Sequence, residues 1–294
     1  VLTVHDPPAL VGEPLHVLQN ILINEEVAIL ASELWRRDHS FFIEKWAYHQ
    51  ADAVISLSEQ GIARIREQFG PRNHLFMLPH GIDIPKLNKS SHKDRRSSLG
   101  RLLYFGYLHP DKGVETLIKA VQQLEEGTYH LTIAGEAYKV NDEGALQNER
   151  YRQDLIKQAN SSTHRNMIQF LDFVSDEEVS VLFQQSDMLI LPYRKSSVLS
   201  ASGVLVQGMS YGLPIITTDV RAITEYVQHG STAWLVPPDS PNELAVAIQR
   251  LWENPDIMDR IGLAAYNKCI QRFNWTKVAS QAVDVYLQLL KLRQ

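Results

Sequence analysis

The fold is decided by residues 101–121, RLLYFGYLHPDKGVETLIKAV. The apolar run over 101–105 predicts a strand that is buried on both faces, as in a parallel sheet covered by helices. Gly106 follows at once, and the apolar spacing beyond it predicts a helix over 112–124. A strand, a glycine turn and a helix in this order indicate an α/β protein.

The same alternation extends outward from this stretch in both directions. Strands are predicted over 1–4, 53–57, 75–78, 129–134, 167–171, 188–191, 214–217 and 233–236. Helices are predicted over 59–69, 149–160, 176–185 and 202–211, and from 240 to the end with a break at Asn254-Pro255. Residues 85–100 are polar and rich in Lys, Ser and Arg, which is typical of a linker.

Length and composition narrow the class of protein. A chain of 294 residues with 44% hydrophobic and 21% charged residues has enough apolar material for two domains. The formal net charge of −5 argues against a nucleic-acid-binding protein, which normally has a basic surplus. Cys269 is the single cysteine, so we expect a reducing, cytoplasmic setting and read Cys269 as a small buried residue. No signal peptide or membrane span is evident, and the strand at Val1 predicts that an N-terminal portion is absent.

The loop after the strand at 101–105 is a candidate anion site. Gly106 would let a ligand approach the backbone closely, because glycine has no Cβ. Lys112 would add its charge to the positive end of the helix that follows, which suits a pyrophosphate. The alternative, an exposed lysine in an ordinary turn, has about equal weight on these residues alone.

Two further loops carry candidate residues. Ser202 and Gly203 lie at a predicted helix N-terminus, where free N–H groups can bind phosphate or a sugar hydroxyl, although Ser202 could simply cap the helix. Gln207 lies one turn further on and could contact a ligand hydroxyl or be exposed. His5 follows the opening strand and could act in acid–base chemistry, although a lone histidine is more often structural.

Missing motifs exclude several other classes. There is no GxGxxG after a strand, no GxxxxGK[ST] and no GxSxG, which argues against a nicotinamide dehydrogenase, a P-loop enzyme and a serine hydrolase. There is also no Asp-x-Asp pair and no paired His/Cys spacing, so no bound metal and no cofactor are predicted.

Taken together, the motifs resemble those of the family 4 (group 1) retaining glycosyltransferases of the GT-B fold, over nearly the whole chain. The residues that carry the resemblance are Thr3-Val4-His5-Asp6, Pro79-His80-Gly81-Ile82-Asp83, Phe105–Gly113, Ile133-Ala134-Gly135, Leu191-Pro192-Tyr193-Arg194 and Ser202–Glu225. Their order and spacing are more specific than any single motif.

The resemblance implies an α/β protein with two Rossmann-like domains facing across a cleft. Residues 1–84 would be a partial N-terminal acceptor-side domain, residues 85–272 the nucleotide-sugar-binding domain, and residues 273–294 a helix that crosses back to the first domain. The reaction would transfer a sugar from a nucleoside-diphosphate sugar, UDP-sugar favoured, to a glycan or lipid-linked acceptor. It would retain the anomeric configuration without a metal.

The resemblance also assigns roles to single residues. Gly106 would lie against the donor, and Lys112 would pair with its diphosphate. Ser202, Gly203 and Val204 would offer backbone N–H groups to phosphate or sugar. Gln207 would hold the ribose hydroxyls, and His5 would face the transferred sugar, so that His5 and Lys112 are the expected catalytic residues.

Three positions depart from the family pattern. Tyr107, in the expected donor site, stands where the family usually has arginine, and Leu199 and Gln207 stand where it has two glutamates. These departures motivate the alternative of a non-catalytic GT-B partner subunit that binds nucleotide or glycan, and a GT-B sugar-nucleotide epimerase is a third possibility.

A cluster of basic and aromatic residues could touch a lipid-linked acceptor or the inner face of the membrane. It comprises Trp35, Arg36, Arg37, Phe41, Phe42 and Trp46. A partly buried amphipathic helix is the favoured alternative.

Overall fold

The computed structural model describes residues 2–4, 46–85, 99–137, 142–161, 163–195 and 201–292. The chain divides into two compact units. The first comprises Val1–Pro79, Val198–Ala201 and Val278–Gln294, and the second comprises His80–Ser197 and Ser202–Lys277.

The first unit contains a three-stranded parallel sheet in the order β1-β2-β3. Its elements are β1 (Leu2–Val4), β2 (Val54–Ser56), α4 (Glu59–Phe69) and β3 (Leu75–Met77). The predicted helix over 59–69 is confirmed, and Ser58 caps it by accepting a hydrogen bond from the Gly61 N–H at 3.0 Å. Tyr48, Val54 and Ile65 form a buried apolar cluster in this unit.

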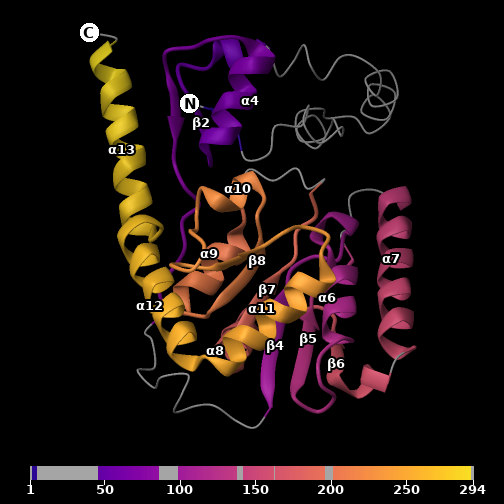
Figure 1. The fold of residues 1–294 in the computed structure, drawn as a ribbon. Helices are drawn as coiled ribbons and strands as arrows, with labels where there is room; N and C mark the ends of the chain where they lie inside the picture. Colours follow the sequence, from indigo (N-terminus) through magenta and orange to yellow (C-terminus); the bar gives the residue numbers. More distant parts are fainter. Residues whose placement is uncertain are drawn as a thin grey trace. The chain divides into compact units, whose positions relative to one another are not determined.

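The second unit is built on a six-stranded parallel sheet (Figure 1). Its strands are β4 (Gly100–Phe105), β5 (Tyr129–Ala134), β6 (Ile168–Leu171), β7 (Met188–Leu191), β8 (Ile215–Thr218) and β9 (Trp234–Val236). The strand order is β6-β5-β4-β7-β8-β9, the Rossmann order, in which the direction of winding reverses between the first and fourth strands of the sheet. The strand predictions from residue 101 onward are confirmed within one or two residues.

Helices connect these strands and cover the sheet. They are α6 (Val114–Val121), α7 (Asp142–Asn160), α8 (Asp176–Gln185), α9 (Gly203–Ser210), α10 (Arg221–Thr224), α11 (Pro241–Glu253) and α12 (Pro255–Arg272), with 3-10 turns at Pro110–Lys112 and Thr163–Met167. The last helix, α13 (Trp275–Leu292), belongs to the first unit from Val278 onward. The predicted break at Asn254-Pro255 is confirmed, because α11 ends at Glu253 and α12 begins at Pro255.

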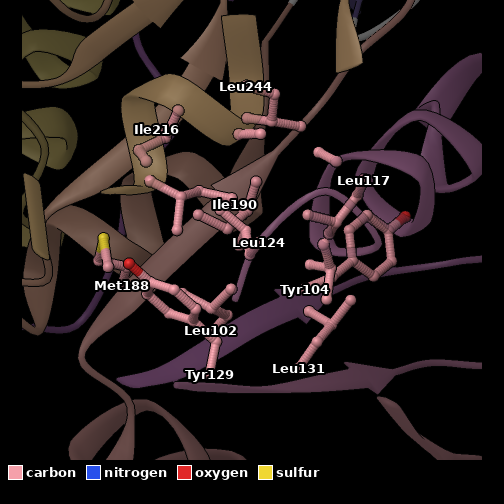
Figure 2. Packing of buried hydrophobic residues seen from close by; sticks show 14 of the residues in the cluster. Leu102, Tyr104, Leu117, Leu124, Tyr129, Leu131, Met188, Ile190, Ile216 and Leu244 are labelled. Atoms are coloured by element: carbon pink, nitrogen blue, oxygen red, sulfur yellow. The ribbon is translucent and has the colours of Figure 1, made fainter. Parts of the chain in front are cut away.

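Side-chain alternation along the central strands gives the sheet two apolar faces. On one face Leu102 and Tyr104 pack in a buried cluster with Leu117 of α6 and Leu244 of α11 (Figure 2). On the other face Phe105 contacts Phe183 of α8, with ring centroids 5.3 Å apart.

Close helix packing on this second face needs small residues. A Cβ on Gly208 of α9 would lie 2.3 Å from Leu189 Cδ2, so a larger residue there would force the Leu189 side chain on β7 to move. Cys269 of α12 is fully buried, as expected for a small core residue.

Two helix boundaries differ from the prediction. The helix expected over 112–124 begins instead at Val114, because Gly113 adopts a left-handed conformation (φ 68°) that separates it from a 3-10 turn. The helix expected over 149–160 begins earlier, at Asp142, where the sequence lacks the apolar spacing that would reveal a helix.

Among the described residues, no helix combines the length and apolar character that a membrane crossing requires. Trp46, the one described member of the basic-aromatic cluster, has 65% of its surface exposed. Trp35, Arg36, Arg37, Phe41 and Phe42 lie outside the described residues.

The buried face of α11 should carry much of the stability of the second unit. Leu244 is 1% exposed, whereas Leu263 of α12 is 57% exposed. We expect Leu244→Ala to lower the free energy of unfolding by about 2–5 kcal/mol, since it removes packed methyl groups and leaves a cavity. Leu263→Ala makes the same chemical change at the surface and should shift stability by less than about 0.5 kcal/mol. Urea unfolding of both variants checks this, and equal losses would contradict the packing described here.

Candidate functional site

A pocket of about 370 Å³ opens within the second unit at the carboxyl edge of its sheet. Its lining comes from the end of β4, from the segments that follow β4, β5, β6 and β7, and from the first turn of α9. The lining residues are Tyr104, Phe105, Gly106, Tyr107, Lys112, Gly135, Glu136, Phe173, Val174, Tyr193 and Val204. The carboxyl ends of β4 and β7 meet where the strand order reverses, which is where open α/β sheets bind their ligands.

Two glycines form a backbone floor for this pocket. Gly106 (φ 133°) and Gly135 (φ 149°) follow β4 and β5, and both adopt conformations that side-chain-bearing residues rarely take. A Cβ on Gly135 would lie 2.0 Å from the Gly106 carbonyl oxygen. The two loops therefore touch backbone to backbone.

Lys112 lies in the pocket lining, at the end of the 3-10 turn Pro110–Lys112. His109 caps this turn by accepting a hydrogen bond from the Asp111 N–H at 3.3 Å. The predicted position of Lys112 at the start of an α-helix is wrong, because Gly113 intervenes before α6. Lys112 still comes two residues before α6 in the chain, and its Nζ is 5.1 Å from the centroid of the Tyr193 ring.

The turn that carries Lys112 packs against the segment after β7. A Cβ on Gly113 would lie 2.0 Å from the Pro192 carbonyl oxygen, and the Arg194 N–H donates to the Asp111 carbonyl at 3.0 Å. Two backbone contacts thus fix the turn against residues 192–194.

Side-chain ion pairs reinforce the same junction. Arg194 donates to Glu115 of α6 at 3.2 Å and to Asp239 at 3.0 Å, and Tyr151 of α7 donates to Glu115. Asp239 has φ 58°, and it also accepts from the backbone N–H of Lys195 at 3.2 Å. The Arg194 side chain is 42% exposed, so its ion pairs add geometric definition more than stability.

The N-terminus of α9 forms another wall. Ser202 caps the helix by accepting from the Leu205 N–H at 3.1 Å, which confirms the capping interpretation. The Ser202 hydroxyl also pairs with the Tyr193 hydroxyl at 2.7 Å. Val204 lines the pocket, whereas Ser202, Gly203 and Gln207 are not among its lining residues.

Gly203 faces a histidine instead of the pocket. A Cβ on Gly203 would lie 3.3 Å from His80 Nε2. The His80 Nδ1 is 2.8 Å from the Gly81 carbonyl, which can only accept, so Nδ1 carries the proton of that bond. His80, which belongs to the Pro79–Asp83 motif that supports the family resemblance, thus lies beside the start of α9.

Aromatic side chains dominate the rim and walls of the pocket. Tyr107 and Phe173 are 57% and 76% exposed, which is unusual for such large apolar groups. The buried Tyr104 hydroxyl donates to the Tyr107 carbonyl at 2.9 Å and so fixes the loop after Gly106. Burial raises the pKa of Tyr104 well above its ordinary value, so this hydroxyl remains a donor at neutral pH.

The predicted site residues are only partly brought together. Gly106, Tyr107, Lys112 and Val204 share the pocket lining. His5 and Leu199 lie outside the described residues.

Sequence reasoning assigned no role to several lining residues. Gly135, Glu136, Phe173, Val174 and Tyr193 belong to this group. Each follows the carboxyl end of a strand, so the strand assignment itself was the signal that could have found them.

The chemistry of the pocket suits a ligand with both a flat and an anionic part. Among the described lining residues, Lys112 supplies a positive charge and Glu136 a negative one. Exposed aromatic faces can stack on a planar ring. Glycine backbone and a lysine beside a helix N-terminus can receive phosphate oxygens.

Comparison with known proteins agrees with this geometry. The family model described as "Glycosyl transferases group 1" matches residues 87–268. Glycogen synthase of Mycobacterium tuberculosis is 27% identical over 263 residues, which cover 88% of this chain and 59% of that protein. D-rhamnosyltransferase WbpZ of Pseudomonas aeruginosa is 29% identical, over 76% of this chain and 56% of that protein. The chain thus spans less than two thirds of the length of these relatives.

Solved structures show the fold. The crystal structure of HepE from Anabaena in complex with UDP-glucose superposes with a TM-score of 0.73 at 20% identity, over 86% of this chain and 68% of that one. Sucrose-phosphate synthase from Thermosynechococcus elongatus gives a TM-score of 0.74 at 21% identity, over 99% of this chain and 67% of that one. These likenesses confirm the predicted α/β, GT-B fold class.

The backbone contact beneath the pocket can be tested by adding a single methyl group. In Gly135→Ala the Cβ would meet the Gly106 carbonyl oxygen at 2.0 Å, whereas around Gly127 (φ 81°) nothing lies within 4 Å. We expect Gly127→Ala to cost about 1–2 kcal/mol of unfolding free energy, from backbone strain alone. Gly135→Ala should cost about 1–3 kcal/mol more, because β4 and β5 must separate. Urea unfolding gives both values, and matching losses would show that the two loops do not touch.

Proposed function

The chain belongs to the group 1 glycosyl transferases, and on that premise we propose that it binds a nucleoside-diphosphate sugar in the pocket beside Lys112. UDP-sugar is the favoured donor. The acceptor would be a glycan or glycolipid in polysaccharide or cell-envelope synthesis. The observation that carries this proposal is one pocket that holds an ammonium, a glycine backbone floor and exposed aromatic rings at the carboxyl edge of a Rossmann-ordered sheet.

The preference for UDP has support from similar proteins. HepE was crystallised with UDP and with UDP-glucose, and its fold is that of this chain. The exposed Tyr107 and Phe173 offer flat faces on which the base of the donor could stack, while the diphosphate would lie nearer Lys112.

The proposed mechanism assigns Lys112 to the leaving group. As the bond between the anomeric carbon and the diphosphate oxygen breaks, negative charge grows on the diphosphate and positive charge grows on the sugar. A fixed ammonium near that oxygen stabilises the charge where it develops and needs no reorganisation at the moment of reaction. We propose that transfer retains the anomeric configuration, as in family 4, and uses neither a metal nor another cofactor.

The remaining assignments extend the family resemblance. His5 would face the transferred sugar, the N-terminal residues of α9 would offer N–H groups, and Gln207 would hold the ribose hydroxyls. We propose a cytoplasmic location, with peripheral contact at the inner membrane face as a further proposal. The domain division at residues 84 and 272 is proposed on the same basis.

A non-catalytic partner subunit is the alternative function. Tyr107, Leu199 and Gln207 replace an arginine and two glutamates that family members usually carry, which favours this alternative. Under it the pocket would bind nucleotide or glycan without turnover, whereas the enzyme proposal requires release of UDP from a UDP-sugar.

Calorimetric titration with UDP, GDP and ADP tests the donor pocket. We expect one diphosphate, UDP, to bind selectively, and Lys112→Ala to weaken it about 10- to 100-fold, since hydrogen bonds to charged groups contribute about 1.5–3 kcal/mol. Lys119→Ala removes an exposed lysine from the same βα unit, on α6, and should leave the affinity unchanged.

The outcomes separate the alternatives. If the folded protein binds none of the three nucleotides, the donor-site proposal fails. Binding that depends on Lys112, combined with no UDP release from any UDP-sugar in the presence of glycan and glycolipid acceptors, would favour the partner-subunit alternative. An equal loss of affinity in the Lys119 variant would show that general charge, not the pocket, attracts the nucleotide.

A further inference from the structure

Tyr193 lies between the two elements that could bind a diphosphate. It is the second residue after β7, is 3% exposed, and lines the pocket. Its ring lies beneath the Lys112 ammonium, with Nζ 5.1 Å from the centroid. Its hydroxyl pairs at 2.7 Å with the hydroxyl of Ser202, the cap of α9. One side chain thus contacts both Lys112 and the start of α9.

The residues around Tyr193 hold it firmly in this place. Thr218 of β8 donates from Oγ1 to the Tyr193 carbonyl at 2.7 Å. Pro192 and Arg194, on either side, make the backbone contacts that fix the turn bearing Lys112. Three consecutive residues after β7 therefore support that turn, and Tyr193 is the one that also reaches α9.

The hydroxyl pair is suited to a fixed connection. Burial raises the pKa of Tyr193 to about 12, so the hydroxyl stays protonated at neutral pH. Ser202 Oγ accepts the Leu205 N–H and still has a second lone pair and its own proton for Tyr193. The pair holds its geometry, because breaking it would cost the buried Tyr193 hydroxyl this hydrogen bond, while Ser202 would keep only its bond from the Leu205 N–H.

We propose that Tyr193 is a positioning residue that couples Lys112 to the N-terminus of α9, so that both act on one diphosphate. This inference rests on the proposed function. A lysine side chain loses much rotamer freedom when it binds an anion. Its attraction to the Tyr193 ring restricts it beforehand, and so lowers that cost. The hydroxyl pair holds the first turn of α9 at a constant distance from the same ring.

The experiment measures UDP affinity by calorimetry in variants that remove either the hydroxyl contact or the ring contact of Tyr193. Tyr193→Phe keeps the ring and deletes the hydroxyl, and Ser202→Ala deletes its partner. We expect Tyr193→Phe to raise the Kd for UDP about fivefold. Ser202→Ala also removes the cap bond to the Leu205 N–H, so its loss should be at least as large. The double variant should lose no more affinity than Ser202→Ala alone, because both changes remove the same hydroxyl pair. Tyr193→Leu removes the ring, and in that background Lys112→Ala should weaken binding much less than in the wild type.

A matched control lies at the other end of the same helix. Tyr211, after the last turn of α9, shares a hydroxyl pair with Ser180 of α8 at 2.9 Å. Tyr211→Phe deletes an equivalent tyrosine–serine pair and should leave the UDP affinity unchanged. Urea unfolding of both Phe variants separates effects on stability from effects on binding.

Each result decides between distinct conclusions. If UDP binding is lost in Lys112→Ala but is the same in Tyr193→Phe, Ser202→Ala and wild type, the coupling is wrong and the donor site stands. Additive losses in the double variant would also overturn the coupling, as would equal losses of affinity in the Tyr193 and Tyr211 variants. If wild-type protein binds no UDP, GDP or ADP, the donor site fails and this inference fails with it. If Tyr193→Leu does not fold, Tyr193→Phe and Ser202→Ala still test whether the hydroxyl pair affects UDP binding.

Discussion

The pairing of β4 with β7 is the constraint on which the rest of the second unit depends. These strands are distant in sequence, yet Leu102 pairs with Met188 and Leu103 with Leu189 in parallel register. Because their carboxyl ends lie at the same edge, the loop that carries Lys112 and the segment that carries Tyr193 become neighbours. The core residues that hold the pair together, such as Tyr104 and Ile190, are fully buried (Figure 2). The pocket therefore depends directly on packing within the sheet.

Sequence reasoning recovered the features that depend on neighbouring residues. Apolar runs located the strands, and Ser202 marked a helix start, because capping and burial leave local patterns. The start of α6 was placed too early, although Pro110 and Gly113 are residues that favour turns. Gly113 takes a left-handed backbone conformation between two helical turns, and the spacing of apolar residues does not predict such a conformation.

The rest of the site could not be read from the sequence because it depends on strand order. Nothing near Tyr193 indicates that Lys112 lies above its ring or that Ser202 lies at its hydroxyl. The contiguous motif after the strand at 101–105 indicated Gly106 and Lys112, and the family resemblance gave them roles toward the donor. The resemblance gave no role to Gly135, whose contact is with the backbone of a neighbouring loop. A contiguous motif therefore predicts residues within one loop, but it does not predict contacts between loops that follow different strands.

Gly113, beside the pocket, and Gly135, in its lining, also limit how this sequence can evolve. Every mutation away from glycine introduces a Cβ, and at positions 113 and 135 that atom would lie 2.0 Å from a carbonyl oxygen of another loop. A single step in sequence therefore disturbs two loops at once, and compensation would need a second change in the opposing main chain. The side chains of rim residues such as Tyr107 and Phe173 are exposed, so a substitution there does not force a neighbouring loop to move. We therefore expect homologous chains to differ mainly at rim positions, where substitutions can change ligand preference. The glycines at positions 113 and 135 should stay the same.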